Sequence, residues 1–177
     1  SGSVSYGRLR IEMTGAAPLS GTFMLTALSG TSGAYSVPIG TSVTTASLTN
    51  WHHYAFSVKN SSSNLEIKFY QDGTLLETIV TGTSMNKVTG SLIGRIGALQ
   101  THVSGADFSF ATSPAAGWGK LSASLDEFRF WKSVRTSEDV GKNWWTQVNG
   151  GVNSDDANVD LGVYYKFNEG ITLTASV

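Results

Sequence analysis

Hydrophobic and polar positions alternate in short runs along much of the chain. Residues 54–58 alternate Tyr, Phe and Val with Ala and Ser, and residues 65–69 alternate Leu, Ile and Phe with Glu and Lys. A period of two places one set of side chains in a core and the other in water, so these runs predict half-buried antiparallel strands. Asp72-Gly73 follows the second run, and both residues tolerate the positive φ angles of a tight hairpin turn. The pattern predicts an all-β protein built from hairpins.

Similar runs predict the remaining strands. They lie at residues 7–13, 23–28, 34–39, 75–80, 91–97 and 161–167. Turns rich in Gly, Ser and Thr separate several of them. Residues 98–120 show no sustained period, and we expect a long irregular loop there. Phe56, Phe69 and Phe128 are expected to be buried between the sheets.

One short helix is expected, from about Ser137 to Val148. Thr136 precedes it, and Asp139 follows three residues later, which resembles a capping box. Residues 149–151, Asn-Gly-Gly, suit the end of a helix. Apolar side chains recur inside it every four residues, so one face would pack against the sheets. These side chains are Val140, Trp144 and Val148.

The composition fits one globular domain spanning residues 1–177. Hydrophobic residues make up 40% of the chain and charged residues 14%, which is enough apolar material for a sizeable core. The formal net charge of −1 gives no electrostatic reason to expect binding to nucleic acid or to an anionic membrane. No segment reaches the ~18 continuous apolar residues of a membrane span, so insertion into a membrane is not expected. The chain has no cysteine, and this favours a bacterial or viral source over a secreted eukaryotic one.

Three motifs together resemble a known family. They are W-x-H-x-A at residues 51–55, Y-x-D-G at residues 70–73, and D-E-x-R at residues 126–129 before the helix. Their order and spacing resemble the laminin-G-like, concanavalin A-type family over roughly residues 35–150. The resemblance implies a two-sheet antiparallel jelly-roll sandwich. Its relatives usually bind carbohydrate or other proteins, and occasionally hydrolyse glycans.

The C-terminal sequence leaves two interpretations open. Residues 167–170, Phe-Asn-Glu-Gly, resemble a motif that commonly opens a domain of this family. They either close this sandwich, in a strand beside the first one, or begin a following module. Under both interpretations we expect the domain to be excised from a longer modular protein. A phage virion or bacterial surface protein fits this picture, so the expected location is extracellular or on a virion surface.

The sequence does not predict an enzyme. The resembled family includes glucanases. These enzymes carry paired carboxylates on one face of a strand, at the separation that a retaining mechanism needs. Residues 124–129 are the nearest match, but Ser, Phe and Arg occupy the flanking positions. Asp126 and Glu127 are adjacent and would point to opposite faces, so Asp126 is expected to make a structural hydrogen bond. His52 and His53 are also neighbours, and His53 is expected to be a structural histidine bonded to a loop.

Asp156, Asn158 and Asp160 are the candidate metal ligands. They stand at positions 1, 3 and 5 of a polar segment, where a loop can turn three oxygens towards one hard cation. The family resemblance makes calcium the candidate cofactor, since several relatives hold it at loop ends. The residues that would complete an EF-hand loop are missing. The alternative is a polar turn held by side-chain hydrogen bonds.

Trp118, between two glycines, is the candidate residue for stacking on a sugar. An aromatic ring packs on the apolar C–H face of a sugar, while polar side chains bind its hydroxyl groups. The candidate polar partners are His102, Asp107 and Asn86. Alternatively, Trp118 packs inward against the sheet. Of the other tryptophans, Trp51, Trp131 and Trp144 are expected in the core, and Trp145 lies off the helix's apolar stripe.

We therefore expect a non-catalytic recognition module that binds a glycan or glycoconjugate. The expectation that the ligand is a glycan rests on the family resemblance, because a fold by itself does not give a function. The alternative is a structural or interaction domain of a virion or surface appendage, with other virion or surface proteins as partners and without glycan binding.

Overall fold

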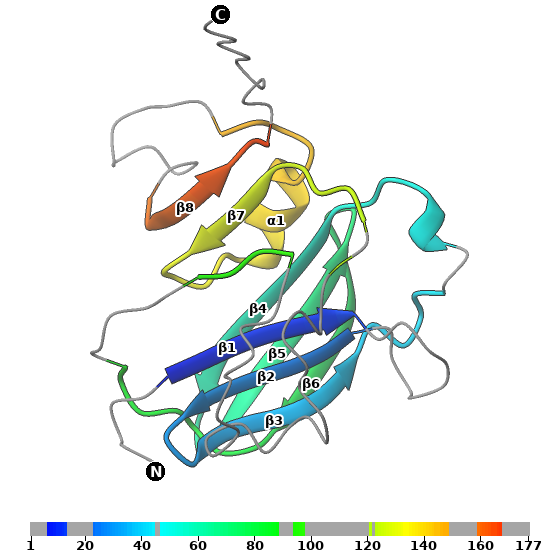
Figure 1. Cartoon of the computed structure of the whole chain (residues 1–177). Coiled ribbons are helices and arrows are strands. Elements are labelled where there is room, and N and C mark those ends of the chain that lie inside the picture. Colours follow the sequence, from blue (N-terminus) through cyan, green and yellow to red (C-terminus); the bar gives the residue numbers. More distant parts are fainter. Residues whose placement is uncertain are drawn as a thin grey trace, which may run out of the picture.

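The computed structural model describes residues 7–13, 23–44, 47–88, 94–97, 121, 123–148 and 159–167. Its elements are β1 (Gly7–Met13), β2 (Phe23–Ser29), β3 (Ser32–Ile39), the 3-10 helix η1 (Ser47–Thr49), β4 (Tyr54–Ser61), β5 (Asn64–Gln71), β6 (Thr74–Thr81), β7 (Phe128–Trp131), α1 (Ser137–Asn143) and β8 (Leu161–Tyr165). Two three-stranded antiparallel sheets, β1-β2-β3 and β4-β5-β6, form the two layers of a sandwich (Figure 1). The expected all-β architecture with one short helix is confirmed.

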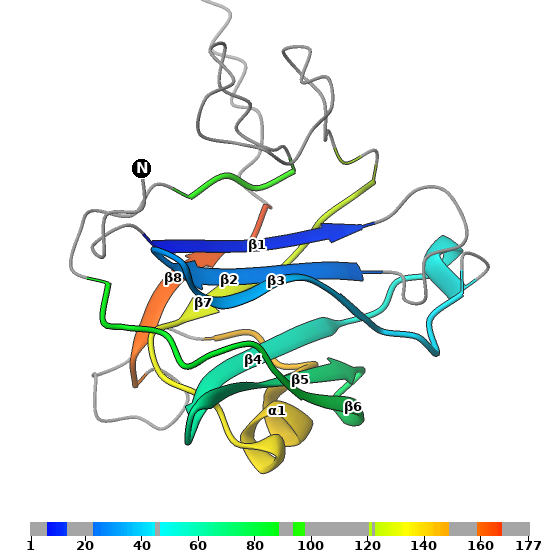
Figure 2. The same ribbon diagram turned by 90° about the horizontal axis from the view of Figure 1, so that it is seen from below.

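A third, two-stranded sheet is formed by β7 and β8. Seen from below, α1 lies on the outer side of the β4-β5-β6 sheet, away from the β1-β2-β3 sheet (Figure 2). Strand β8 pairs with β7, whereas β1 pairs with β2 among the described strands. The sequence leaves open that the last strand closes the sandwich beside the first strand. Among the described strands β8 does not pair with β1, so that interpretation is wrong for them. No helix in the described part of the chain is long and apolar enough to cross a membrane.

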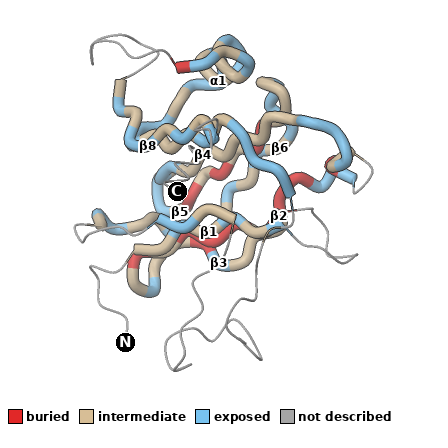
Figure 3. The backbone as a smooth tube through the Cα atoms, turned by 45° about the horizontal axis from the view of Figure 1, so that its top comes forward, coloured by how far each residue is buried: buried red, intermediate tan, exposed pale blue. Residues whose placement is uncertain are grey.

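The core lies between the facing strands of the two sheets (Figure 3). Strands β2 and β5 alternate as predicted, and each points a row of apolar side chains inward because antiparallel pairing keeps the alternating faces aligned. The rows comprise Phe23, Leu25 and Ala27 from β2 and Leu65, Ile67 and Phe69 from β5. Full burial of a large apolar side chain stabilises a fold by about 1.5–3 kcal/mol relative to exposure.

The predictions for single aromatic side chains had mixed outcomes. Phe69 is 0% exposed, and Phe56 is partly buried against the same core. Phe128 is 36% exposed, so its predicted burial is wrong. Trp51 was also expected in the core, but 70% of it is exposed. Trp145 is 70% exposed, in agreement with its place off the apolar stripe.

The hairpin between β5 and β6 has the predicted turn. Asp72 and Gly73 adopt φ angles of 49° and 77°, which are the left-handed values that the right-handed twist of two-residue hairpins requires. Gly73 also leaves room for the indole of Trp144, since a Cβ there would lie 2.2 Å from Trp144 Cδ1. The turn is therefore in contact with the segment that ends α1.

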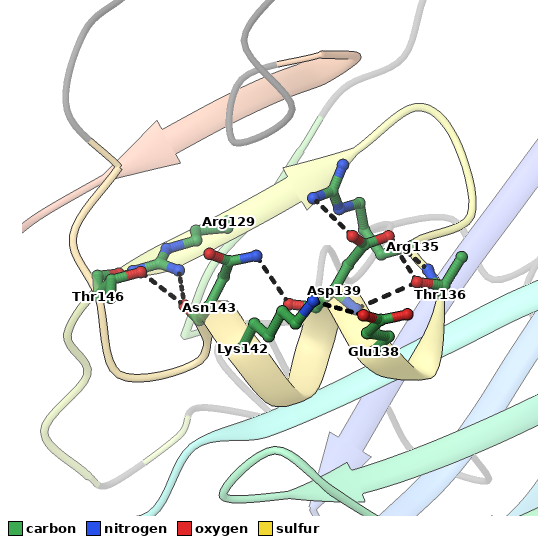
Figure 4. Close-up of polar contacts among 8 residues, drawn as sticks. All are labelled: Arg129, Arg135, Thr136, Glu138, Asp139, Lys142, Asn143 and Thr146. Atoms are coloured by element: carbon green, nitrogen blue, oxygen red, sulfur yellow. Dashed lines mark hydrogen bonds and ion pairs between the residues drawn. The ribbon is translucent and has the colours of Figure 1, made fainter.

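Helix α1 begins as predicted and ends earlier. The backbone N–H of Asp139 donates to Thr136 Oγ1 at 3.1 Å, and the backbone N–H of Thr136 donates to Asp139 Oδ2 at 3.1 Å, which completes the capping box. The helix stops at Asn143 and not at Val148. Arg129 Nη1 donates to the Asn143 carbonyl at 3.0 Å, and its Nη2 donates to the Thr146 carbonyl (Figure 4). A longer helix would need the Asn143 carbonyl for its own backbone ladder.

One side chain of β5, Tyr70, contacts the start of α1. Tyr70 points away from the central core and is 1% exposed. Its hydroxyl lies 3.0 Å from Ser137 Oγ at the start of the helix. Tyr70 therefore packs against the helix on the outer side of the sheet, whereas the inward-facing side chains of β5 pack in the core between the sheets.

The expected strand at residues 91–97 is described only over residues 94–97, which form no strand. Residues 98–120 lie outside the described residues, so the loop expected there stays a prediction.

Candidate functional site

An open groove lies at one end of the sandwich, where the β5-β6 hairpin meets the segment that follows β3. It has a volume of about 360 Å³. Its lining residues are Ser42, Gln71, Asp72, Thr74 and Leu76. We call this surface the end groove. It combines two hydroxyl groups, an amide, a carboxylate and one branched apolar side chain, so it can accept a ligand with both hydroxyl groups and an apolar face.

Asp72 connects the hairpin turn to the residues that precede β4. Its Oδ1 accepts a hydrogen bond from the His53 backbone N–H at 2.9 Å, and its Oδ2 lies 2.7 Å from His52 Nδ1. The Asp72 backbone N–H donates in turn to the His53 carbonyl at 2.9 Å. Burial alone would raise the pKa of Asp72, but the hydrogen bonds from the His53 backbone and from His52 outweigh it and hold this pKa below its usual value. Asp72 is therefore a carboxylate at neutral pH.

The protonation of His52 Nδ1 follows from this contact. A carboxylate can only accept, so His52 Nδ1 carries a proton and donates it to Asp72. Gln71 Nε2 lies 3.2 Å from the same Nδ1, which is longer than the contact with Asp72. Because a protonated nitrogen cannot accept a second hydrogen, the contact with Asp72 sets the orientation of the ring.

His53 occupies a different environment from His52. Its ring centroid lies 6.2 Å from that of Trp144, and its Nδ1 is buried without a hydrogen-bond partner among the described residues. The hydrogen bond between His53 and the hairpin turn comes from its backbone N–H, which donates to Asp72, and not from Nδ1. Burial lowers the pKa of the His53 imidazole, and the Arg129 guanidinium lowers it further.

The lowered pKa of His53 predicts a loss of stability in mild acid. Below pH 6.5 the unfolded chain binds a proton at His53 that the folded chain does not, so stability falls as the pH falls from 6.5 towards the lowered folded-state pKa. The lowered pKa of Asp72 adds to this loss only near and below its ordinary value of 3.8. Urea denaturation at pH 7.5 and pH 5 should show a lower free energy of unfolding at pH 5, with a limiting slope of about 1.4 kcal/mol per pH unit.

The variant His53→Gln cannot titrate, so its stability should change less between these two pH values. His52→Gln is the matched control, because it removes a neighbouring imidazole and keeps His53. If His53→Gln retains the full difference between pH 7.5 and pH 5, another group is responsible.

The two carboxylates before β7 have structural partners. Asp126 Oδ1 accepts from the Glu127 backbone N–H at 2.9 Å, which agrees with the hydrogen-bonding role expected for Asp126. Glu127 Oε2 accepts from the Tyr164 hydroxyl and from Arg129 Nη2, the latter at 3.1 Å. Burial alone would raise the pKa of Glu127, but the hydrogen bonds from Tyr164 and Arg129 hold it below its usual value. This role of Glu127 was not predicted from the sequence.

The residues predicted for ligand and metal binding are only partly described. Those outside the described residues are Trp118, His102, Asp107, Asp156 and Asn158. Asn86 is exposed after β6. Asp160 is exposed with a φ of 60°, and its carbonyl accepts from the Lys132 N–H at 2.8 Å. The described residues contain no group of three or more His, Cys, Asp or Glu side chains placed to hold a metal ion. Each predicted set has one described member, so both sets stay predictions.

Two exposed tryptophans are sequence neighbours of residues that contact the hairpin turn. Trp51 directly precedes His52, whose ring is held by Asp72. Trp145 directly follows Trp144, whose indole abuts Gly73 in the same turn. Sequence reasoning missed Trp51 as an exposed ring. Trp51 precedes the alternating run at residues 54–58. Only residues inside that run have a predicted inward or outward face, so its position could have indicated exposure.

The comparison with known families covers most of these elements. A family model described as the Concanavalin A-like lectin/glucanases superfamily matches residues 3–141. That segment contains both three-stranded sheets, the end groove and all three motifs that carry the resemblance. No curated protein and no solved structure matches the chain. The match over most of the chain confirms the resemblance, and the chain belongs to the concanavalin A-like lectin/glucanases superfamily.

Proposed function

We propose that this protein is a non-catalytic module that recognises carbohydrate. Membership of a superfamily of lectins and glucanases supports the ligand class. The observation that carries the proposal is the end groove, which brings hydroxyl, amide and carboxylate groups together at the tip of the β5-β6 hairpin. Loops and turns held by a sandwich are common places for recognition, because the sheets fix their position while the side chains vary.

The chemistry of the end groove suits a saccharide. A sugar ring has hydroxyl groups at its edge and an apolar face of C–H groups, so it needs polar partners and a surface on which to pack. Asp72, Gln71 and Thr74 supply the polar groups, and Leu76 supplies apolar surface within the groove. Trp51 adds an exposed ring one residue from His52. We assign to Trp51 the role of stacking on the ligand.

The state of two described carboxylates, Asp72 and Glu127, supports a non-catalytic role for these residues. A glycosidase needs one carboxyl group with a raised pKa to protonate the leaving oxygen. The pKa values of Asp72 and Glu127 are both lowered. Glu127 is also bound to Arg129 and Tyr164, so it is not available to a substrate without breaking those contacts.

A second location for the ligand remains proposed around Trp118, with His102, Asp107 and Asn86. A calcium ion bound by Asp156, Asn158 and Asp160 remains proposed as well. These two proposals rest on the sequence pattern and the family resemblance. Mutation can test whether the ligand binds around Trp118 or in the end groove.

Trp51→Ala should weaken glycan binding about tenfold or more, because a stacked aromatic ring is lost. It should leave the melting temperature nearly unchanged, since a substitution at a side chain that is 70% exposed removes little packing. The measurement is titration of an oligosaccharide hit from a glycan array against wild-type and variant proteins, with Trp145→Ala as the matched exposed control.

Trp118→Ala decides between the two locations in the same titration. A loss of affinity in Trp118→Ala with unchanged affinity in Trp51→Ala would place the ligand in the segment 98–120. An array on which the wild-type protein binds no glycan would contradict the proposed function.

An interaction role is the second candidate, and one surface favours it. Strand β1 has a row of exposed apolar side chains. These side chains lie on the same face of the sheet as the core residues of β2, with which they pair. They are Leu9, Ile11 and Met13, which are 51%, 42% and 38% exposed. Exposed apolar rows on sheets often mark contacts with other proteins. A silent glycan array together with concentration-dependent assembly in light scattering would favour this role.

A further inference from the structure

We propose that the end groove selects uncharged saccharides, with Asp72 as the acceptor for their hydroxyl groups and His52 as the residue that positions Asp72. This inference rests on the proposed function and narrows it to a class of ligand. Three features carry it: the charge of the groove, the unused hydrogen-bonding capacity of Asp72, and the fixed orientation of its carboxylate.

The charge of the groove disfavours an anionic ligand. Asp72 is the one charged side chain among the five described residues that line it. A second carboxylate lies at the same end of the sheets, where Glu77 Oε2 accepts from the backbone N–H groups of Gly40 at 2.8 Å and Thr41 at 3.1 Å. A sialic acid, uronic acid or sulfate group in the groove would face negative charge with no cation among the lining residues, and like charges brought together at a binding surface cost affinity.

Asp72 has capacity left for a ligand. A carboxylate offers about four lone-pair positions. The described contacts come from the His53 backbone to Oδ1, from His52 to Oδ2 and from the Gln71 side chain, which together use three of these positions. Its side chain is 33% exposed and lines the groove, so the remaining lone pair can accept from a hydroxyl group of a ligand. Hydrogen bonds to an ionised acceptor are roughly twice as strong as those between neutral groups.

The orientation of the carboxylate is set before a ligand arrives. Oδ1 and Oδ2 are held from two directions, by a backbone group and by an imidazole ring. A group that is already oriented loses less conformational freedom on binding, so it discriminates better between ligands. His52 contributes through Asp72 and is therefore a positioning residue.

The experiment uses the whole chain on a glycan array that carries matched pairs of oligosaccharides, each in a neutral form and in a sialylated or sulfated form. The neutral member of a bound pair should bind about tenfold or more tightly than its acidic counterpart at low salt. Asp72→Asn should weaken neutral binding about tenfold and reduce this preference. Asparagine keeps the shape of the side chain and tolerates the left-handed turn, so this variant tests the charge.

Ser42→Lys keeps the proposal testable if Asp72→Asn does not fold. Ser42 is exposed, outside the strands and in the groove lining, so a lysine there adds positive charge without altering the turn. It should raise the affinity for the acidic member of each pair relative to the neutral one.

A double-mutant cycle tests the positioning role of His52. His52→Phe keeps a ring and loses the hydrogen bond to Asp72, so it should weaken binding in the wild-type background and have little further effect beside Asp72→Asn. Equal losses in both backgrounds would show that His52 acts independently of Asp72.

The outcomes separate the two levels of the proposal. Glycans that bind equally well or better in their acidic forms, a preference for cationic amino sugars, or an Asp72→Asn protein with unchanged affinity would each overturn the neutral-saccharide inference and leave carbohydrate recognition standing. Absence of any bound glycan would overturn both.

Discussion

Phe69→Ala should lower the free energy of unfolding by about 3–5 kcal/mol, because it removes a large side chain from the centre of the core. The ring is 0% exposed. Its centroid lies 5.6 Å from that of Phe23, 5.2 Å from Phe56 and 6.1 Å from Tyr54. These neighbours belong to strands of both sheets, so they cannot move together to fill the space. The cost therefore combines lost burial with a cavity.

Urea denaturation of wild-type and variant proteins measures this effect as a shift in the midpoint at constant slope. Phe128→Ala is the matched control, since the same atoms are removed from a side chain that is 36% exposed. Its cost should be clearly smaller. Equal costs at the two positions, or a loss below about 1 kcal/mol for Phe69→Ala, would show that Phe69 does not occupy the centre of the core.

Arg129→Ala should cost about 3 kcal/mol, because a buried charge then leaves several partners unpaired. The Arg129 side chain is 9% exposed and binds the carbonyls of Asn143 and Thr146 together with the Glu127 carboxylate (Figure 4 shows the two carbonyl contacts). Its guanidinium also lies 5.6 Å from the ring centroid of Tyr164. One side chain thus joins β7, the end of α1 and β8.

The same denaturation experiment checks this expectation. Arg129→Lys should recover only part of the loss, since an ammonium group lacks the planar fork that reaches two carbonyls and a carboxylate at once. Lys142→Ala is a surface control, because Lys142 pairs with Glu138 on an exposed helix face and such pairs contribute little. A cost for Arg129→Ala no larger than that of Lys142→Ala would mean that the carbonyls find other partners.

The sequence pattern predicted the structure correctly where the contacts join residues that are close in the chain. The alternation of β4 and β5 and the Asp72-Gly73 turn lie within one stretch of chain, so residue order alone predicted the sheet that they form. The capping box at Thr136 is equally local. The end of α1 was mispredicted because it depends on Arg129, which precedes the helix and comes from another element.

Burial was less predictable than alternation. A period of two identifies two faces, but whether a face is covered depends on what packs on it. Phe128 belongs to β7, which pairs only with β8 in the described part of the chain, and its face stays partly open. For the same reason the pattern predicted the turn at Asp72 but not its bond to His52, because that contact requires the register of β4 against β5.

The structure of the hairpin tip has a consequence for how this surface can diversify. Asp72 holds the turn and the residues before β4, so most replacements there would disturb the hairpin. Ser42 and Thr74 line the same groove, are exposed, and serve neither of those purposes. A library randomised at these two positions should therefore yield many folded proteins with different ligand preferences, whereas one randomised at Asp72 should yield mostly unstable ones.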